Sequence, residues 1–174
     1  MWGDGQASSV QNGAIQLSIV CPGRGSIRFG PLTRSSIGSV SDYDFIDGRI
    51  SVVDEDGVIE TLADRNGIES LALANFRDDL RQLVHARHGV VFFGDHDFGQ
   101  IVELEVIQPG VIRVLANLAS SSRFNVSVGE IAFAAVDEIV DQIDRLESAL
   151  GPLLGYCGAC GVPSHAYYPK PLTL

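Results

Sequence analysis

The 174-residue sequence has few basic residues, few cysteines and no long apolar run. It contains 12 Lys and Arg against 22 Asp and Glu, and its formal net charge of -10 repels phosphate backbones and anionic lipids. No apolar run reaches the roughly 20 residues that a membrane span needs, and residues 1–13 lack the basic start and apolar stretch of an export signal. We therefore expect a cytoplasmic protein without nucleic-acid or membrane partners.

The three cysteines, Cys21, Cys157 and Cys160, are too few and odd in number for a disulfide framework. Cys157 and Cys160 have the spacing of a zinc knuckle, and His165 and Cys21 would complete a set of three thiolates and one imidazole. One Cys-x-x-Cys pair is also compatible with a redox pair or with incidental thiols. Whether these residues hold zinc stays open, and neither a metal nor a cofactor is predicted.

The composition, 45% apolar and 20% charged with 19 glycines, is that of an ordinary globular protein, and the length suits one domain. We expect a flexible N-terminal segment over residues 1–13 and a single α+β domain over residues 14–151. Residues 152–174, with Pro163, Pro169 and Pro171, are expected to form an irregular tail.

Alternating apolar residues predict a mainly antiparallel sheet. Asp54-Glu55-Asp56-Gly57 and Gln108-Pro109-Gly110 lie between apolar runs, as hairpin turns do. Residues 31–44 are rich in Ser, Gly and Asp and are predicted to be a loop. The expected strands are Ile15–Ile19, Ser26–Phe29, Arg49–Val53, Val58–Leu62, Ile68–Leu73, Val90–Phe93, Gln100–Ile107, Val111–Asn117 and Phe124–Val128.

Helical spacing appears in two places. Asn75 is a plausible N-cap with Asp78 and Asp79 in the first turn of a helix that ends before Gly89. A second helix ends at Gly151, and its apolar stripe is Ala132, Val136, Ile139, Ile143, Leu146 and Leu150. The predicted fold class is α+β, a curved and mainly antiparallel sheet with two helices packed on one face.

Few residues suggest chemistry. His85, His88 and His96, with Asp95 and Asp97, could bind a metal or act in acid–base catalysis, although His88 also suits a helix C-terminus. The sequence has neither a nucleophile elbow nor a phosphate-binding glycine loop in the required context. We therefore predict that the protein is not an enzyme.

Acidic residues of the second helix form the most informative pattern. At about 100° per residue, Asp137, Asp141 and Asp144 fall in one sector with Glu130. Like charges at this spacing weaken a helix by a few tenths of a kcal/mol per pair. The stripe is either a solvated face or a surface that meets Lys and Arg of a protein partner.

Three segments resemble a bacterial family: residues 71–83 (LALANFRDDLRQL), residues 102–106 (VELEV) and residues 124–150 with the closing helix. Together they are similar to the small immunity proteins of polymorphic and contact-dependent toxin systems, notably the WapI-immunity-like group. The resemblance covers residues 14–150 and leaves out the Cys-x-x-Cys tail. It implies a non-enzymatic cytoplasmic antitoxin that binds one cognate toxin domain, often a nuclease, and blocks its active site.

The expected partner is thus a cognate, basic toxin, bound by a chain that is a monomer or a weak homodimer. The apolar anchors expected in its loops are Tyr43, Phe45 and Phe98. The alternatives are a small metal-binding enzyme, a zinc-stabilised accessory domain and a subunit that assembles with copies of itself. The predicted partner-binding residues are Glu130, Asp137, Asp141, Asp144, Asp42, Asp44, Asp95 and Asp97.

Overall fold

The computed structural model describes residues 15–34, 45–62, 68–95, 99–118, 122–151 and 153. Its helices are α1 (Ser70–Ala86) and α2 (Phe133–Leu150). Its strands are β1 (Ile15–Val20), β2 (Ser26–Arg34), β3 (Phe45–Asp47), β4 (Ile50–Val53), β5 (Ile59–Leu62), β6 (Ile68–Glu69), β7 (Val90–Asp95), β8 (Gly99–Gln108), β9 (Val111–Leu118) and β10 (Arg123–Ile131).

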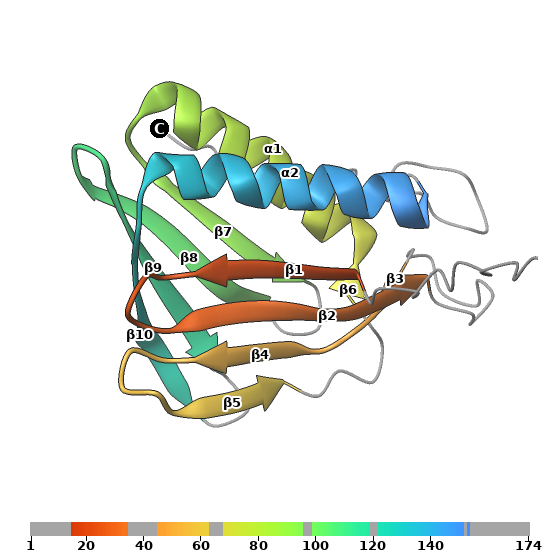
Figure 1. The fold of residues 1–174 in the computed structure, drawn as a ribbon, viewed down its shortest axis with the longest axis horizontal. Helices are drawn as coiled ribbons and strands as arrows, with labels where there is room; N and C mark the ends of the chain where they lie inside the picture. Colours follow the sequence, from red (N-terminus) through yellow and green to blue (C-terminus); the bar gives the residue numbers. More distant parts are fainter. Residues whose placement is uncertain are drawn as a thin grey trace, which may run out of the picture.

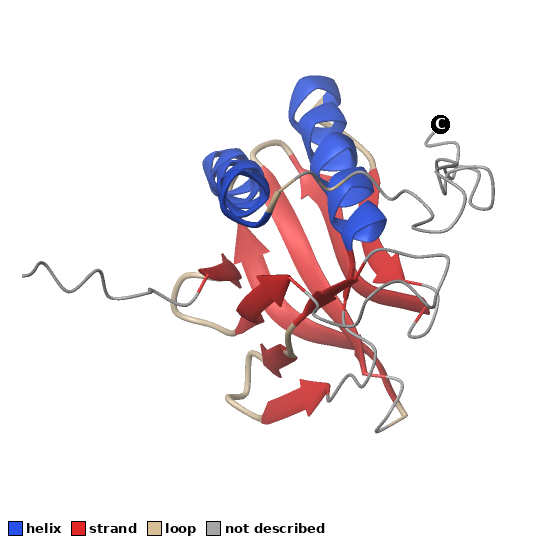
Figure 2. Ribbon diagram, turned by 90° about the vertical axis from the view of Figure 1, so that its right-hand side faces the viewer, coloured by secondary structure: helices blue, strands red, loops and turns tan. Residues whose placement is uncertain are grey.

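The strands form two antiparallel sheets that curve around one interior, and the two helices lie side by side over it (Figures 1 and 2). The first sheet has the order β5-β4-β2-β3-β6, with β1 also paired to β2, and the second is the meander β10-β9-β8-β7. Helix α1 packs against β7, β6 and α2, and α2 packs against β1. The predicted α+β class with antiparallel strands is confirmed, whereas its division into two sheets was not predicted.

Both predicted hairpin turns are present, and each ends in a glycine that the turn requires. Gly57 after β4 has a φ of 82°, and Gly110 after β8 also has a φ of 82°. Side chains disfavour this left-handed conformation, whereas glycine adopts it freely. The turns join β4 to β5 and β8 to β9 in antiparallel register.

The first helix starts earlier than predicted. A strand was expected over Ile68–Leu73 and an N-cap at Asn75, but β6 ends at Glu69 and α1 begins at Ser70. Consequently Asp78 and Asp79 lie inside the helix and not in its first turn. Leu71, Ala72, Leu73 and Ala74 are all apolar, so this run has no periodicity that distinguishes a strand from a buried helical turn.

Strand β2 is longer than predicted and includes residues 31–34 of the expected loop. It extends because its two ends have different partners: Ser26–Phe29 pair with β4, whereas Thr33 and Arg34 pair with β3. Residues 35–44 of the expected loop lie outside the described residues, as do residues 1–14 and 154–174.

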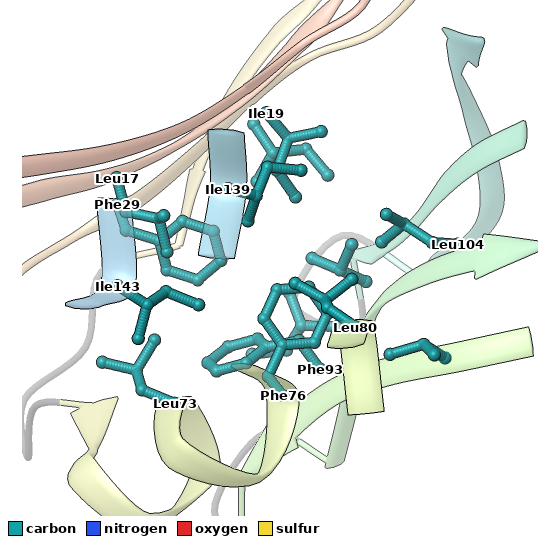
Figure 3. Packing of buried hydrophobic residues seen from close by; sticks show 14 of the residues in the cluster. Leu17, Ile19, Phe29, Leu73, Phe76, Leu80, Phe93, Leu104, Ile139 and Ile143 are labelled. Atoms are coloured by element: carbon teal, nitrogen blue, oxygen red, sulfur yellow. The ribbon is translucent and has the colours of Figure 1, made fainter. Parts of the chain in front are cut away.

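Three phenylalanines join the layers at the centre of the core. The ring of Phe93 on β7 lies 5.0 Å from that of Phe29 on β2 and 5.5 Å from that of Phe76 on α1, both edge to face. All three rings are at most 1% exposed, and they pack among aliphatic side chains of both sheets and both helices (Figure 3). Such aromatic pairs contribute about 0.5–1.5 kcal/mol beyond the burial of their area.

The two sheets are also joined by backbone hydrogen bonds along β10. The amide of Gly25 donates to the carbonyl of Val128 at 2.8 Å, and the amide of Glu55 donates to that of Ser127 at 3.0 Å. A register shift between Ser127 and Gly129 interrupts the pairing of β10 with β9. These carbonyls therefore find donors in the turns after β1 and β4.

An ion pair reinforces this joint. The guanidinium of Arg123 on β10 donates to the carboxylate of Asp54 at 2.7 Å and also contacts Glu60 on β5. Asp54 accepts from the amides of Asp56 at 3.0 Å and Val58 at 2.9 Å as well. The acidic turn thus serves to form a hairpin and to hold Arg123.

The opposite edge of the first sheet is closed by a side chain of α2. The side-chain amide of Gln142 accepts a hydrogen bond from the Ser18 amide at 2.7 Å and donates to the Ser18 carbonyl at 3.2 Å. A neighbouring strand would make the same two bonds. Gln142 therefore covers part of the edge of β1, which would otherwise be open to strand pairing.

We expect Gly25→Ala to destabilise the protein severely, because a Cβ at this position would lie 2.0 Å from the carbonyl oxygen of Val53. A clash with fixed backbone should cost about 3 kcal/mol or more. Gly57→Ala is the matched control, since its Cβ would meet nothing within 4 Å and only its positive φ is strained, at a cost of about 1–2 kcal/mol. Urea unfolding of both variants gives the comparison; equal losses would contradict a close approach at Gly25.

We also expect Asp54→Asn to remove a pH-dependent part of the stability. Its hydrogen bond with Arg123, with smaller contributions from the Val58 and Asp56 amides, outweighs burial and lowers the pKa of Asp54 below its ordinary 3.8. Such a group stabilises the fold above its ordinary pKa, and the effect is lost as pH falls through the lowered value. The variant should lose about 1–3 kcal/mol at neutral pH. The difference from the wild type should shrink in urea titrations below about pH 4; a constant difference would contradict the pairing.

Candidate partner-binding surface

Helix α2 has the amphipathic form that its sequence predicts. Val136, Ile139, Ile143 and Leu146 face the core and are at most 2% exposed. Its remaining surface carries five carboxylates and one arginine, which gives this helix the formal charge of -4. The carboxylates are not equivalent, because α1 lies alongside part of this surface (Figure 1).

Two arginines of α1 neutralise the end of this acidic surface. Arg77 donates to Asp144 at 3.1 Å and also contacts Glu147, while Arg81 donates to Asp144 at 2.8 Å. Both arginines also lie within 3.6 Å of Asp78 on their own helix. Asp144 therefore belongs to the contact between the helices and is half-buried.

The pKa values of this cluster shift in the directions that favour its charges. Burial of Arg77 disfavours its charged form, but the hydrogen bond with Glu147 and the surrounding carboxylates raise its pKa overall. Burial likewise opposes ionisation of Glu147, yet Arg77 and the amide of Leu153 lower its pKa. The Leu153 amide donates to Glu147 at 3.1 Å, so the same cluster also fixes the chain just after α2.

Asp137 and Asp141 differ from Asp144. Both are exposed on α2, and neither forms an ion pair with another described residue. Glu138, the third exposed carboxylate of this half of the helix, accepts from Arg145 at 2.9 Å. Asp137 and Asp141 are thus the part of the predicted stripe that keeps an uncompensated charge.

The placement of Glu130 on the same helical sector is wrong. Glu130 lies on β10, three residues before α2 begins, and pairs across the second sheet with Arg113. Arg113 in turn pairs with Glu105 on β8 and forms an ion pair with it. Glu130 belongs to a row of charges across strands because the chain is extended until Ile131, and helical spacing does not apply to it.

The remaining predicted binding residues fall in loops that the structure does not describe. Asp42, Asp44 and Asp97 lie outside the described residues, as do the proposed anchors Tyr43 and Phe98. Asp95 ends β7 and Phe45 begins β3, but only their backbones are described. Their role in binding stays a prediction.

The residues of the alternative metal sites lie partly inside and partly outside the described ranges. Within the described ranges, no group of three or more His, Cys, Asp or Glu side chains is placed to hold a metal ion. Burial, with a smaller contribution from the carboxylate of Glu130, raises the pKa of Cys21 to about 11, so its thiol is protonated at neutral pH. Such a thiol is a poor nucleophile. Cys157, Cys160, His165 and His96 lie outside the described residues.

A hollow of about 560 Å³ opens between β1 and α2, and the Glu138–Arg145 ion pair contributes to its wall. The other walls are mostly apolar or amide side chains: Ile15, Gln16, Gln142, Leu146 and Ala149. Among the described residues that line the hollow, Glu138 and Arg145 are the charged ones, and they pair with each other.

Comparison with known proteins returns no relative: no family model, no curated protein and no solved structure matches this chain. Neither helix in the described part of the chain is long and apolar enough to cross a membrane. The surface therefore has to be interpreted from its own chemistry.

Sequence reasoning identified the acidic stripe but missed the arginines that neutralise one end of it. Arg77 and Arg81 are four residues apart, so they lie on one face of α1. That spacing could have predicted a basic patch on α1. The sequence did not show which carboxylates they would meet, because Asp144 is 63 residues away from Arg81.

We expect Arg77→Met to destabilise the protein by about 1–3 kcal/mol, because Glu147 loses its arginine and only the exposed Arg81 is left to neutralise Asp144 and Asp78. Arg81→Met is the matched control: its side chain is 50% exposed, against 15% for Arg77, and should cost less than about 1 kcal/mol. Thermal unfolding of both variants measures the two losses of stability, and that of Arg77→Met should be the larger. A larger loss for Arg81→Met would place the essential contact at the exposed arginine.

Proposed function

We propose that this protein is an immunity protein, which binds a cognate basic toxin domain and neutralises it through the exposed carboxylates of α2. The observation that carries the proposal is the uncompensated pair Asp137 and Asp141 on a helix with formal charge -4. The resemblance of residues 14–150 to toxin-immunity proteins supports the same assignment.

The carboxylates would act mainly on the rate and selectivity of binding. Exposed charges attract an oppositely charged surface over about one Debye length, roughly 8 Å at physiological salt. They contribute less to the final affinity, which comes from a few desolvated contacts. Occlusion of the toxin active site by the bound protein would then be the inhibitory step.

Helix α2 is a suitable platform for such contacts. Its inner face is anchored on β1 and on α1, so its outer carboxylates are held by a rigid element. Arg77 and Arg81 neutralise the end near Leu150, and the guanidinium of Arg87 lies 4.6 Å from the centre of the Phe133 ring at the other end. The uncompensated negative charge of the first half is therefore that of Asp137 and Asp141. A cationic partner is therefore expected over the first half of the helix.

The test first identifies a large secreted protein encoded immediately upstream of this chain, and then measures the rate at which its C-terminal domain associates with the chain. Asp137→Lys/Asp141→Lys should lower the association rate at low salt by about tenfold or more, because complementary charges are replaced by like ones. The wild-type rate should fall as salt rises, whereas that of the variant should not.

Glu55→Lys/Asp56→Lys makes the same charge change in the β4–β5 turn and is the matched control. Its rate should stay nearer to that of the wild type. Equal rates for the wild type and the α2 variant at low salt would overturn the assignment of the surface. Failure of the wild-type chain to inhibit the toxin would overturn the proposed function itself.

A further inference from the structure

The outer face of the first sheet carries a row of four residues, three of them apolar, that crosses four strands and is called the apolar row below. Val20 on β1 pairs with Ser26 on β2, Ser26 pairs with Val53 on β4, and Val53 pairs with Ile59 on β5. Side chains alternate along each strand, so these four lie on the opposite face from Ile19, Ile27 and Val52, which enter the core. Val20 and Ile59, at the two ends of the row, are exposed, whereas Val53 is half-buried and Ser26 is buried between its neighbours. The row spans three strand spacings, about 14 Å.

Large apolar side chains are concentrated here. Ile59 is 69% exposed, Val20 is 54% exposed, and Val58, next to Ile59, is 48% exposed. In the described ranges only Phe124 and Ile107 are comparably exposed, and they belong to the second sheet. A row of this kind on a sheet face is typical of a surface that another molecule covers.

Charges of opposite sign flank the row on its two sides. Arg28 lies in the next row, paired across the strands with Ser18 and Ser51. On the other side, the β4 chain continues into the turn that carries Asp56. Arg28 and Asp56 are both exposed, and neither forms an ion pair with a described residue.

From this arrangement we propose that the outer face of the β1-β2-β4-β5 strands binds a second copy of this chain. In a two-fold dimer, each surface meets an identical one. A two-fold axis along the apolar row would pack row against row and reverse the strand direction between the copies. Arg28 of each copy would then face the side on which the other copy carries Asp56.

Charge complementarity favours this occupant. The surface is mostly apolar along the axis and carries Arg28 on one side; on the other side Glu55 and Asp56 outnumber Arg24 of the β1–β2 turn. A two-fold operation therefore brings the basic side of one copy to the more acidic side of the other. Helix α2 lies beside β1 (Figure 1), and its Glu138 lines one hollow together with Val20 at the end of the row. Because the face is only about 14 Å wide, the dimer should be weak, with a Kd on the order of 10 µM to 1 mM.

Sedimentation equilibrium of the full chain, from about 1 µM to about 1 mM, should show a monomer that dimerises over this range. Ile59→Lys should raise the Kd by about tenfold or more, because it places an ammonium group in the apolar contact. Val20→Lys should act in the same direction. Phe124→Lys is the matched control: this side chain is 64% exposed but lies on β10, and its Kd should match that of the wild type.

A charge swap tests the orientation of the two copies. Arg28→Asp and Asp56→Arg should each raise the Kd, whereas the double variant should restore it to within about threefold of the wild-type value. Unfolding temperatures verify that all variants are folded. A wild-type mass that stays monomeric throughout would overturn the dimer, as would equal effects of Ile59→Lys and Phe124→Lys. A double variant weaker than both single ones would overturn the two-fold arrangement.

Discussion

The fold depends on the joint between the two sheets, which lies along β10. This strand belongs to the second sheet, but its pairing with β9 is interrupted between Ser127 and Gly129. At the bulge of β10, the carbonyls of Ser127 and Val128 turn toward the first sheet and accept hydrogen bonds from Glu55 and Gly25. Buried backbone groups need partners, so these two bonds fix where the sheets meet. Gly25 is required because the chain passes too close to Val53 for any side chain. With the joint closed, Phe29 and Phe93 from different sheets can share one core.

The positions of the arginines also explain which carboxylates of the protein keep an unpaired negative charge. Several of its few arginines lie at structural joints: Arg123 between the sheets, and Arg77 and Arg81 between the helices. Each draws two or more carboxylates into a local cluster. The acids beyond their reach, Asp137 and Asp141 above all, stay exposed and uncompensated. The acidic residues therefore fall into two groups: those that pair with arginines at the joints, and those that stay unpaired. The surface proposed for a basic partner consists of the unpaired ones.

Short-range patterns were the most predictable part of the fold. The hairpin at Asp54–Gly57 and the helix from Phe133 were foreseeable because a turn glycine or a helical stripe is a property of adjacent residues. The start of α1 at Ser70 was not foreseeable, because the apolar run Leu71–Ala74 fits either a strand or a helix. In the folded protein this segment is helical and packs against β6 and β7. For the candidate site, the sequence indicated the acidic helix but assigned Glu130 to it wrongly and treated Asp144 like Asp137.

By itself, the sequence determined the α+β class, the hairpin turns and the amphipathic α2 with its acidic side, because these depend on local periodicity and turn chemistry. Only the tertiary structure decided that there are two sheets, that Arg77 and Arg81 neutralise Asp144, and that Val20, Val53 and Ile59 align on an outer face. Contacts of this kind join residues that are tens of positions apart in the chain. Their energies depend on distance in space, which no pattern of neighbouring residues specifies.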